Sequence, residues 1–141
     1  MIHCDGSAVP NPGRMGLGAV LTAPDGTRHS LSTQAEGRGC NNEAELRALM
    51  AALQEARRHG ASTLVIHCDN SVVVGQLAGT ALEPFVRLAA LFEEVRSELR
   101  SFASARLVWI PRHRNREADA LARAAVGLMP KNPVPAGKHR P

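Results

Sequence analysis

The sequence predicts an α/β fold in which a five-stranded mixed sheet, with three antiparallel strands and two parallel ones, has helices on both faces. Two observations lead to this prediction. The chain opens with three strand-like segments separated by short turns, and two apolar strand segments then alternate with stretches of helical periodicity. Antiparallel neighbours need only tight turns, whereas parallel strands need helical crossovers that cover the sheet.

The antiparallel part is expected near the start of the chain. Short strands are predicted at residues 2–5, 16–23 and 28–35. The Pro-Asp-Gly sequence at residues 24–26 has the turn chemistry of a hairpin between the second and third strands. A three-stranded meander therefore opens the fold.

The central segments predict a helix, a buried strand and a second helix. The helix at residues 42–59 ends at Gly60. Its apolar residues at helical spacing are Leu46, Leu49, Met50 and Leu53. Residues 63–68 are an apolar run with β-branched members, which is typical of a strand buried on both faces. Helical character then resumes at residues 71–78.

The following segment predicts a further helix and the last strand. Glu83 and Pro84 suit a helix start, and apolar residues at helical spacing continue as far as Leu99. A strand is expected at residues 107–110, where Pro111 ends it.

A final helix is expected to open at Asn115, a residue type that favours helix starts. Its inward-facing residues would be Leu121, Ala122 and Ala125. Beyond it, repeated prolines predict a disordered tail at residues 129–141. The chain thus predicts one folded domain at residues 1–128, in keeping with its length.

The composition, 44% hydrophobic and 21% charged over 141 residues, fits a soluble globular protein. No run of about 18 apolar residues predicts a membrane span. Because the first strand begins at Ile2, no secretory signal is expected, and we expect a cytoplasmic monomer. The three cysteines, Cys4, Cys40 and Cys68, lack a C-x-x-C pair and are expected to be buried small hydrophobes.

Positive charge favours a polyanionic partner. The net charge is +4, and three arginines lie between residues 112 and 116, so the surface would attract phosphate backbones. The same charge is compatible with solvated helix faces that carry Arg47, Arg57 and Arg58. Charge alone does not choose between these two interpretations.

Four acidic residues, Asp5, Glu45, Asp69 and Asp119, each lie where a predicted strand ends or a predicted helix begins. In mixed sheets of this kind, ligands gather near the carboxyl ends of the parallel strands. The predicted topology brings all four acids to that edge. We therefore expect their side chains to converge on one pocket.

Each acid also has a purely structural interpretation. Asp5 fits a turn at a strand end, and Asp69 fits the N-cap of the helix that follows it. Glu45 fits the third helical position of a capping box, and Asp119 fits an i,i+4 pair with Arg123. Caps and turns are common individually, but they give no reason for four acids to gather at one edge.

Converging carboxylates require a counter-charge, because two like charges about 4 Å apart repel by roughly 4 kcal/mol at an effective dielectric of 20. Hard oxygen ligands without His or Cys favour Mg²⁺, with Mn²⁺ as an alternative, over Zn²⁺. Two such ions about 3.5 to 4 Å apart can activate a water and stabilise a leaving oxygen at phosphorus. The acids therefore predict metal-dependent phosphodiester hydrolysis.

Four separated motifs occur in the order and at the distances of one known family. They are Asp5-Gly-Ser with Asn11-Pro-Gly, Asn41-Asn42-Glu43-Ala44-Glu45, Cys68-Asp69-Asn70, and the segment from Trp109 to Arg123 with His113, Asn115 and Asp119. The chain resembles the type 1 ribonuclease H (ribonuclease HI) family over nearly all residues before the tail. The resemblance implies a ribonuclease H-like fold and a catalytic domain at residues 1–128.

The resemblance also implies an activity and its ligands. The expected reaction is endonucleolytic hydrolysis of the RNA strand of RNA–DNA hybrids, which leaves 5′-phosphate and 3′-hydroxyl ends. Two Mg²⁺ ions would be held by the carboxylates of Asp5, Glu45, Asp69 and Asp119, and double-stranded RNA is a further candidate substrate.

Other site residues follow from the same resemblance. Asn11, Asn41 and Asn42 would line the minor groove of the hybrid, where the 2′-hydroxyl distinguishes RNA from DNA. Their alternative roles are a turn and a helix cap. His113 would aid proton transfer or product release, and its alternative is a solvated histidine in an arginine-rich loop.

The chain departs from better-known members in three ways. Asn70 replaces a common serine, and Cys40 stands where a phosphate-binding threonine is usual. Between Gly79 and Arg106 there is no Lys- and Trp-rich insertion that would form a basic handle, so the chain resembles compact members. Two other functions stay open: a module of the same fold that binds hybrid or double-stranded RNA without cutting, and a related phosphotransferase such as an integrase or 3′-exonuclease.

Overall fold

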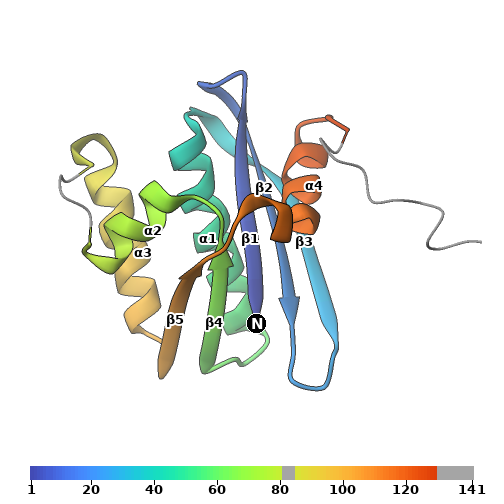
Figure 1. The fold of residues 1–141 in the computed structure, drawn as a ribbon, viewed down its shortest axis with the longest axis vertical. Coiled ribbons are helices and arrows are strands. Elements are labelled where there is room, and N and C mark those ends of the chain that lie inside the picture. Colours follow the sequence, from blue (N-terminus) through green and yellow to red (C-terminus); the bar gives the residue numbers. More distant parts are fainter. Residues whose placement is uncertain (81–84, 130–141) are drawn as a thin grey trace, which may run out of the picture.

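A computed structural model describes residues 1–80 and 85–129 and contains the expected five-stranded mixed sheet, in the order β3-β2-β1-β4-β5 (Figure 1). The strands are β1 (Ile2–Val9), β2 (Gly13–Thr22), β3 (Arg28–Gly39), β4 (Thr63–Cys68) and β5 (Ser104–Trp109). The strand pairs β1–β2 and β2–β3 are antiparallel, whereas β1–β4 and β4–β5 are parallel. The predicted division into three antiparallel and two parallel strands is confirmed.

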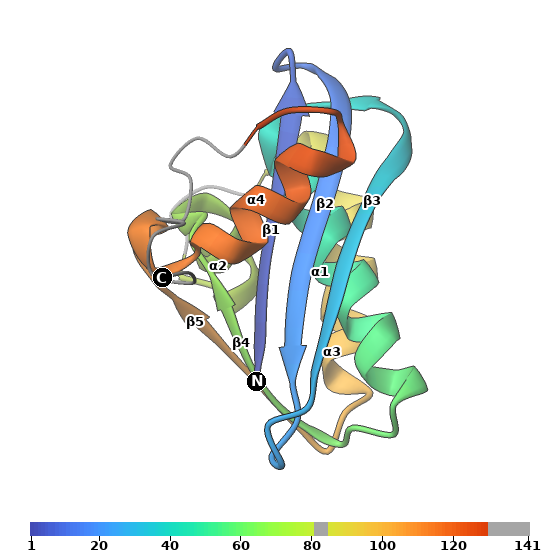
Figure 2. The ribbon, with the colours of Figure 1, turned by 90° about the vertical axis from the view of Figure 1, so that its right-hand side faces the viewer.

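Helices cover both faces of this sheet, as the sequence predicts. They are α1 (Asn41–Arg58), α2 (Ser71–Ala78), α3 (Ala89–Arg100) and α4 (Arg116–Ala125), with short 3₁₀ turns η1 (Val86–Leu88) and η2 (Arg112–Arg114). Figure 2 shows α4 on one side of the sheet and α1 with α3 on the other. Among the residues that the structure describes, no helix is both long enough and apolar enough to cross a membrane.

The first strand is longer than predicted, which corrects the position of Asp5. Turn-forming residues after Asp5 suggested that the strand ends there, but β1 runs on to Val9 because β2 stays paired with it in register. The parallel pairing with β4, in contrast, stops at Cys4 and Cys68. Asp5 therefore lies in mid-strand, immediately beyond the point where β1 loses its second neighbour.

The prediction that β4 is buried on both faces is only half right. Leu64, Ile66 and Cys68 are buried, but Val65 and His67, which alternate with them, are only half-buried. The reason is that α4 packs over β1, β2 and β3, so the second face of β4 has less cover. The suggested helix start at Glu83 and Pro84, and the tail from residue 130 onwards, lie outside the described residues.

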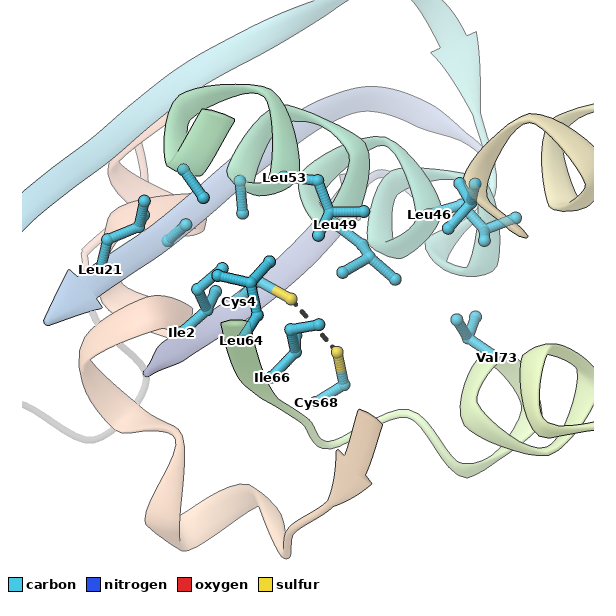
Figure 3. Packing of buried hydrophobic residues seen from close by; sticks show 14 of the residues in the cluster. Ile2, Cys4, Leu21, Leu46, Leu49, Leu53, Leu64, Ile66, Cys68 and Val73 are labelled. Atoms are coloured by element: carbon cyan, nitrogen blue, oxygen red, sulfur yellow. Dashed lines mark hydrogen bonds between the residues drawn. The ribbon is translucent and has the colours of Figure 1, made fainter. Parts of the chain in front are cut away.

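The main core lies between the sheet and the pair α1 and α3 (Figure 3). Its strand side includes Cys4 and Cys68, which are fully buried with their Sγ atoms 3.2 Å apart. Both match the expectation of buried small hydrophobes. Cys40 does not, because it is half-buried and accepts a hydrogen bond from Arg87 Nη2 at 3.1 Å. All three cysteines are free thiols.

Two glycines of β2 set the position of α4. A Cβ atom at Gly16 would overlap the carbonyl oxygen of Ala122, and a Cβ atom at Gly18 would overlap that of Ala118. The helix backbone thus rests directly on the strand backbone, with Ala118 and Ala122 fully buried between them. This close approach fixes the height of Asp119 above the sheet.

Replacing Gly18 with Ala tests this packing. Because a backbone carbonyl cannot move aside as a side chain can, the free energy of unfolding should fall by about 2–4 kcal/mol. Urea unfolding of Gly18→Ala measures it.

The matched control is Gly75→Ala within α2, where a Cβ atom would have its nearest neighbour at 3.7 Å. That variant should be unchanged or more stable, by up to about 1 kcal/mol, because alanine favours the helix. Equal stability of the two variants would contradict the packing described for α4.

Candidate active site

Acidic side chains from distant segments meet at one edge of the sheet. Asp5 comes from β1, Glu45 from the second turn of α1, and Asp69 directly follows β4. One carboxylate oxygen of each lies within 4.8 Å of the others. Asp119, in the first turn of α4, lines the same cleft, whose volume is about 460 Å³. The predicted convergence is thus present in the structure.

The end of the parallel pairing explains how Glu45 is held there. Beyond Cys4, which pairs with Cys68, β1 has no β4 partner for its backbone N–H groups on that side. Buried N–H groups need acceptors. Gly6 N–H donates to Glu45 Oε2 at 2.6 Å, and Ala8 N–H donates to Asn41 Oδ1 at 2.9 Å. The first turns of α1 thus take the place of the missing strand.

Gly6 makes this contact possible. A Cβ atom at this position would overlap the backbone of Ala44 and Glu45, so only glycine lets α1 approach β1 so closely. Gly6 therefore has a packing role beside Asp5, beyond the turn that the sequence suggested.

The structural interpretations of Asp5, Glu45 and Asp69 are wrong. Asp5 lies in a paired strand, and the N-cap of α2 is Asn70, not Asp69. The N-cap of α1 is Cys40, so Glu45 does not complete a capping box. Asp119 does lie in the first turn of α4, while Arg123 Nε donates to the Met129 carbonyl oxygen at 2.8 Å.

Two residues to which the sequence analysis gave no role at the site hold Asp69. Asn115 is 1% exposed, and its Nδ2 donates to Cys4 O and to Asp69 Oδ2, both at 2.9 Å. Trp109 donates its indole N–H to the Asp69 carbonyl oxygen at 3.2 Å and is 50% exposed. Asn115 was expected only to open a helix, but its side chain does not cap α4. The signals in the sequence were its place in the motif from Trp109 to Arg123 and its position four residues before Asp119.

The remaining predicted residues surround the cleft. Asn41 and Asn42 line it, and Asn11, in the turn between β1 and β2, accepts a hydrogen bond from Asn41 N–H at 3.1 Å. Arg112 of η2 also lines the cleft. His113, next to Arg112 in η2, is exposed.

Comparison with known proteins assigns the chain to a family. A family model described as "Reverse transcriptase-like" matches residues 3–125. The crystal structure of RNase H1 from Halobacterium salinarum superposes with a TM-score of 0.83 at 32% identity, covering 89% of this chain and 95% of that one. The chain belongs to the ribonuclease HI family.

Two further relatives bear on this ribonuclease HI domain. A structure of LC11-RNase H1 in complex with an RNA/DNA hybrid has a TM-score of 0.80 at 29% identity, covering 89% of this chain and 94% of that one. A bifunctional protein of Mycobacterium tuberculosis is 37% identical over 127 residues, which are 89% of this chain but 35% of that protein. The chain therefore spans about a third of that relative's length.

The acids of this ribonuclease HI domain are costly to ionise together. Burial, followed by the charges of Glu45 and Asp69, raises the pKa of Asp5 to about 11. Burial also raises the pKa of Glu45, which is 1% exposed, and that of Asp69. A hydrogen bond from Asn115 and the nearby Arg112 oppose the rise at Asp69. Without a cation, a pKa of about 11 keeps Asp5 protonated at neutral pH.

The residues present fit a divalent cation. Glu45 Oε1 is buried and has no hydrogen-bond partner within the described residues, so it is free to act as a ligand. The neighbouring donors are carboxylate oxygens, which Mg²⁺ prefers. A bound cation would also lower these pKa values, because it replaces protons as the counter-charge.

Stabilisation by Mg²⁺ should therefore depend on pH. An unfolded aspartate loses its proton near pH 4, whereas folded Asp5 without metal keeps its proton up to about pH 11. The contribution of Asp5 to the free energy of unfolding without metal thus falls as the pH rises through this window, and Mg²⁺, which displaces the proton, should recover more of it at higher pH.

Thermal unfolding with and without Mg²⁺ at pH 6 and pH 9 measures this dependence. The rise in Tm should be larger at pH 9, by about 5 °C. Taking the difference in Tm with and without Mg²⁺ at each pH cancels the contribution of titrating groups away from the cleft, such as His3. The variant Asp5→Asn is the control and should show a smaller pH dependence, because only Glu45 and Asp69 then keep raised pKa values. An equal Mg²⁺ effect at both pH values in the wild type would contradict the account.

Proposed function

We propose that this chain hydrolyses the RNA strand of RNA–DNA hybrids by two-metal-ion catalysis and leaves 5′-phosphate and 3′-hydroxyl ends. The observation that carries the proposal is the convergence of three buried or half-buried carboxylates, with a fourth on the wall of the same cleft. Support comes from LC11-RNase H1, a structural neighbour whose structure contains an RNA/DNA hybrid.

The ligands in this proposal are the carboxylates of Asp5, Glu45, Asp69 and Asp119, and the ion is Mg²⁺, with Mn²⁺ as a substitute. The chemistry that such ions supply is activation of a water and neutralisation of charge on the leaving oxygen. Asn115 keeps one oxygen of Asp69 engaged, which turns the other towards the cleft. All four acids come from one chain, so a monomer would suffice.

Positive groups at the cleft would attract the phosphate backbone. Arg112 and Arg123 line it beside the acids. They would reduce the electrostatic repulsion between a polyanionic substrate and the carboxylates. This contribution should weaken as the salt concentration rises.

Substrate recognition is assigned to three asparagines and proton transfer to one histidine. Asn41 and Asn42 lie on the cleft wall, and Asn11 is hydrogen-bonded to Asn41, so the three form one row beside the acids. They would contact the minor groove of the hybrid. The side chain of His113, next to Arg112 on η2, is exposed, and we assign it to proton transfer or product release.

The reaction is tested by incubating the protein with labelled RNA–DNA, RNA–RNA and DNA–DNA duplexes in Mg²⁺ or Mn²⁺. We expect cleavage of the RNA strand of the hybrid, and Asp69→Asn should lower kcat by about 10³-fold or more, because a ligand is lost. The end groups of the products are identified by their susceptibility to phosphatase.

The matched control is Asp25→Asn, which makes the same change in an exposed turn where Asp25 Oδ1 accepts the Thr27 N–H. Its kcat should equal that of the wild type. Hybrid binding without cleavage in either metal would instead support a non-cutting module, and cleavage by Asp69→Asn at the wild-type rate would refute the mechanism.

A further inference from the structure

A row of asparagine side chains borders the acids, and the orientation of each amide is set by a backbone group. Val73 N–H donates to the side chain of Asn70 at 3.1 Å. Since a backbone N–H can only donate, the atom that it meets is Oδ1, and Nδ2 of Asn70 points the other way. That Nδ2 donates to Asn42 at 2.8 Å, so the partner atom must be Asn42 Oδ1.

The other two asparagines are oriented in the same manner. Ala8 N–H donates to Asn41 Oδ1 at 2.9 Å, and Asn41 N–H donates to Asn11 Oδ1 at 3.1 Å. The acceptor atoms of Asn11, Asn41 and Asn42 are thus all engaged by protein donors. Within the part of the chain that the structure describes, no protein acceptor engages their Nδ2 groups. The row therefore offers hydrogen-bond donors.

From this polarity we infer that Asn70 is a positioning residue, which acts through Asn42 to make the cleft wall complementary to hydrogen-bond acceptors. The inference rests on the proposed function and deepens it. Every base pair presents acceptors in the minor groove, the purine N3 and pyrimidine O2 atoms, and RNA adds the 2′-hydroxyl oxygen. A wall of donors can read these without regard to sequence, whereas an acceptor turned outwards would find donors only at the guanine amino group and the 2′-hydroxyl hydrogen.

Asn70 is able to do this because its side chain has two functions at once. Its oxygen caps α2, and its amide nitrogen reaches across to Asn42 on α1. A serine at this position could still cap α2, but its single short hydroxyl could not also orient Asn42. The substitution Asn70→Ser therefore separates the two functions.

The test is a double-mutant cycle between Asn70 and Asn42, with binding of a labelled RNA–DNA hybrid measured in EDTA. Asn42→Ala and Asn70→Ser should each weaken binding about fivefold, the effect of one hydrogen bond. If Asn70 acts through Asn42, the double variant should be little weaker than either single one. Losses that multiply to about 25-fold, or an unchanged affinity in Asn70→Ser, would overturn the inference.

Two further measurements separate this role from a merely structural one. With Mg²⁺, Asn70→Ser should raise KM about fivefold and change kcat less than twofold. Urea unfolding should show that the variant is folded; if it is not, Asn70→Asp, which also keeps the cap, replaces it in the cycle. Its added charge is controlled by repeating the titration at two salt concentrations.

Failure of the inference and failure of the proposed function give different results. Because binding is measured without a divalent cation, it does not depend on cleavage. A wild-type protein that binds the hybrid but does not cut it in Mg²⁺ or Mn²⁺ overturns the proposed reaction and leaves the cycle interpretable. A wild type that neither binds the hybrid in EDTA nor cuts it in Mg²⁺ or Mn²⁺ overturns both.

Discussion

The site depends on one mismatch in the sheet, which is that β1 continues past the last residue of β4 that pairs with it. Past Cys4, the strand has lost its parallel neighbour on one side while β2 still holds it on the other. The unpaired backbone groups recruit Glu45 and Asn41 from α1. The same gap leaves room for the carboxylates of Asp5 and Asp69 to face a cleft instead of a ladder of hydrogen bonds.

Gathering the carboxylates at this gap in the sheet has an electrostatic cost that a cation can offset. Carboxylates as buried as Asp5 and Glu45 are destabilising when ionised without a partner, and their raised pKa values express that cost. Around them, small residues fix the spacing of the backbone: Gly6 admits α1, and Gly18 admits α4 with Asp119. Asn115 then ties the end of β4 to β1. Rigid placement of the acids is thus part of the fold itself.

Much of this could be predicted from the sequence, and the limits have physical causes. The class of sheet and the meeting of the acids follow from periodicity and from the positions of acids beside strand ends and helix starts. The length of β1 did not follow, because Asp5-Gly-Ser has local turn chemistry that the continued pairing with β2 overrides. Tertiary pairing outweighed local preference at this position.

Side-chain contacts between distant segments were the least predictable part. Asn115 and Asp69 are 46 residues apart, and Asn70 and Asn42 are 28 apart, so no local pattern indicates either hydrogen bond. The capping box failed because α1 begins earlier than expected, with Cys40 as its N-cap, and the side chain of Asn42, inside the helix, accepts a hydrogen bond from Asn70. Family resemblance pointed to Asn42 as a contact but contained nothing about which of its amide atoms faces a ligand.

The central claim is that buried carboxylates hold protons until a divalent cation replaces them. Calorimetric titration of the protein with Mg²⁺ at pH 8, in two buffers with different ionisation enthalpies, counts the protons released on binding. The account predicts that roughly one proton or more is released for each protein molecule that binds Mg²⁺. The variant Asp5→Asn should release fewer. Binding with no proton release, or no binding of Mg²⁺ or Mn²⁺ at all, would contradict it.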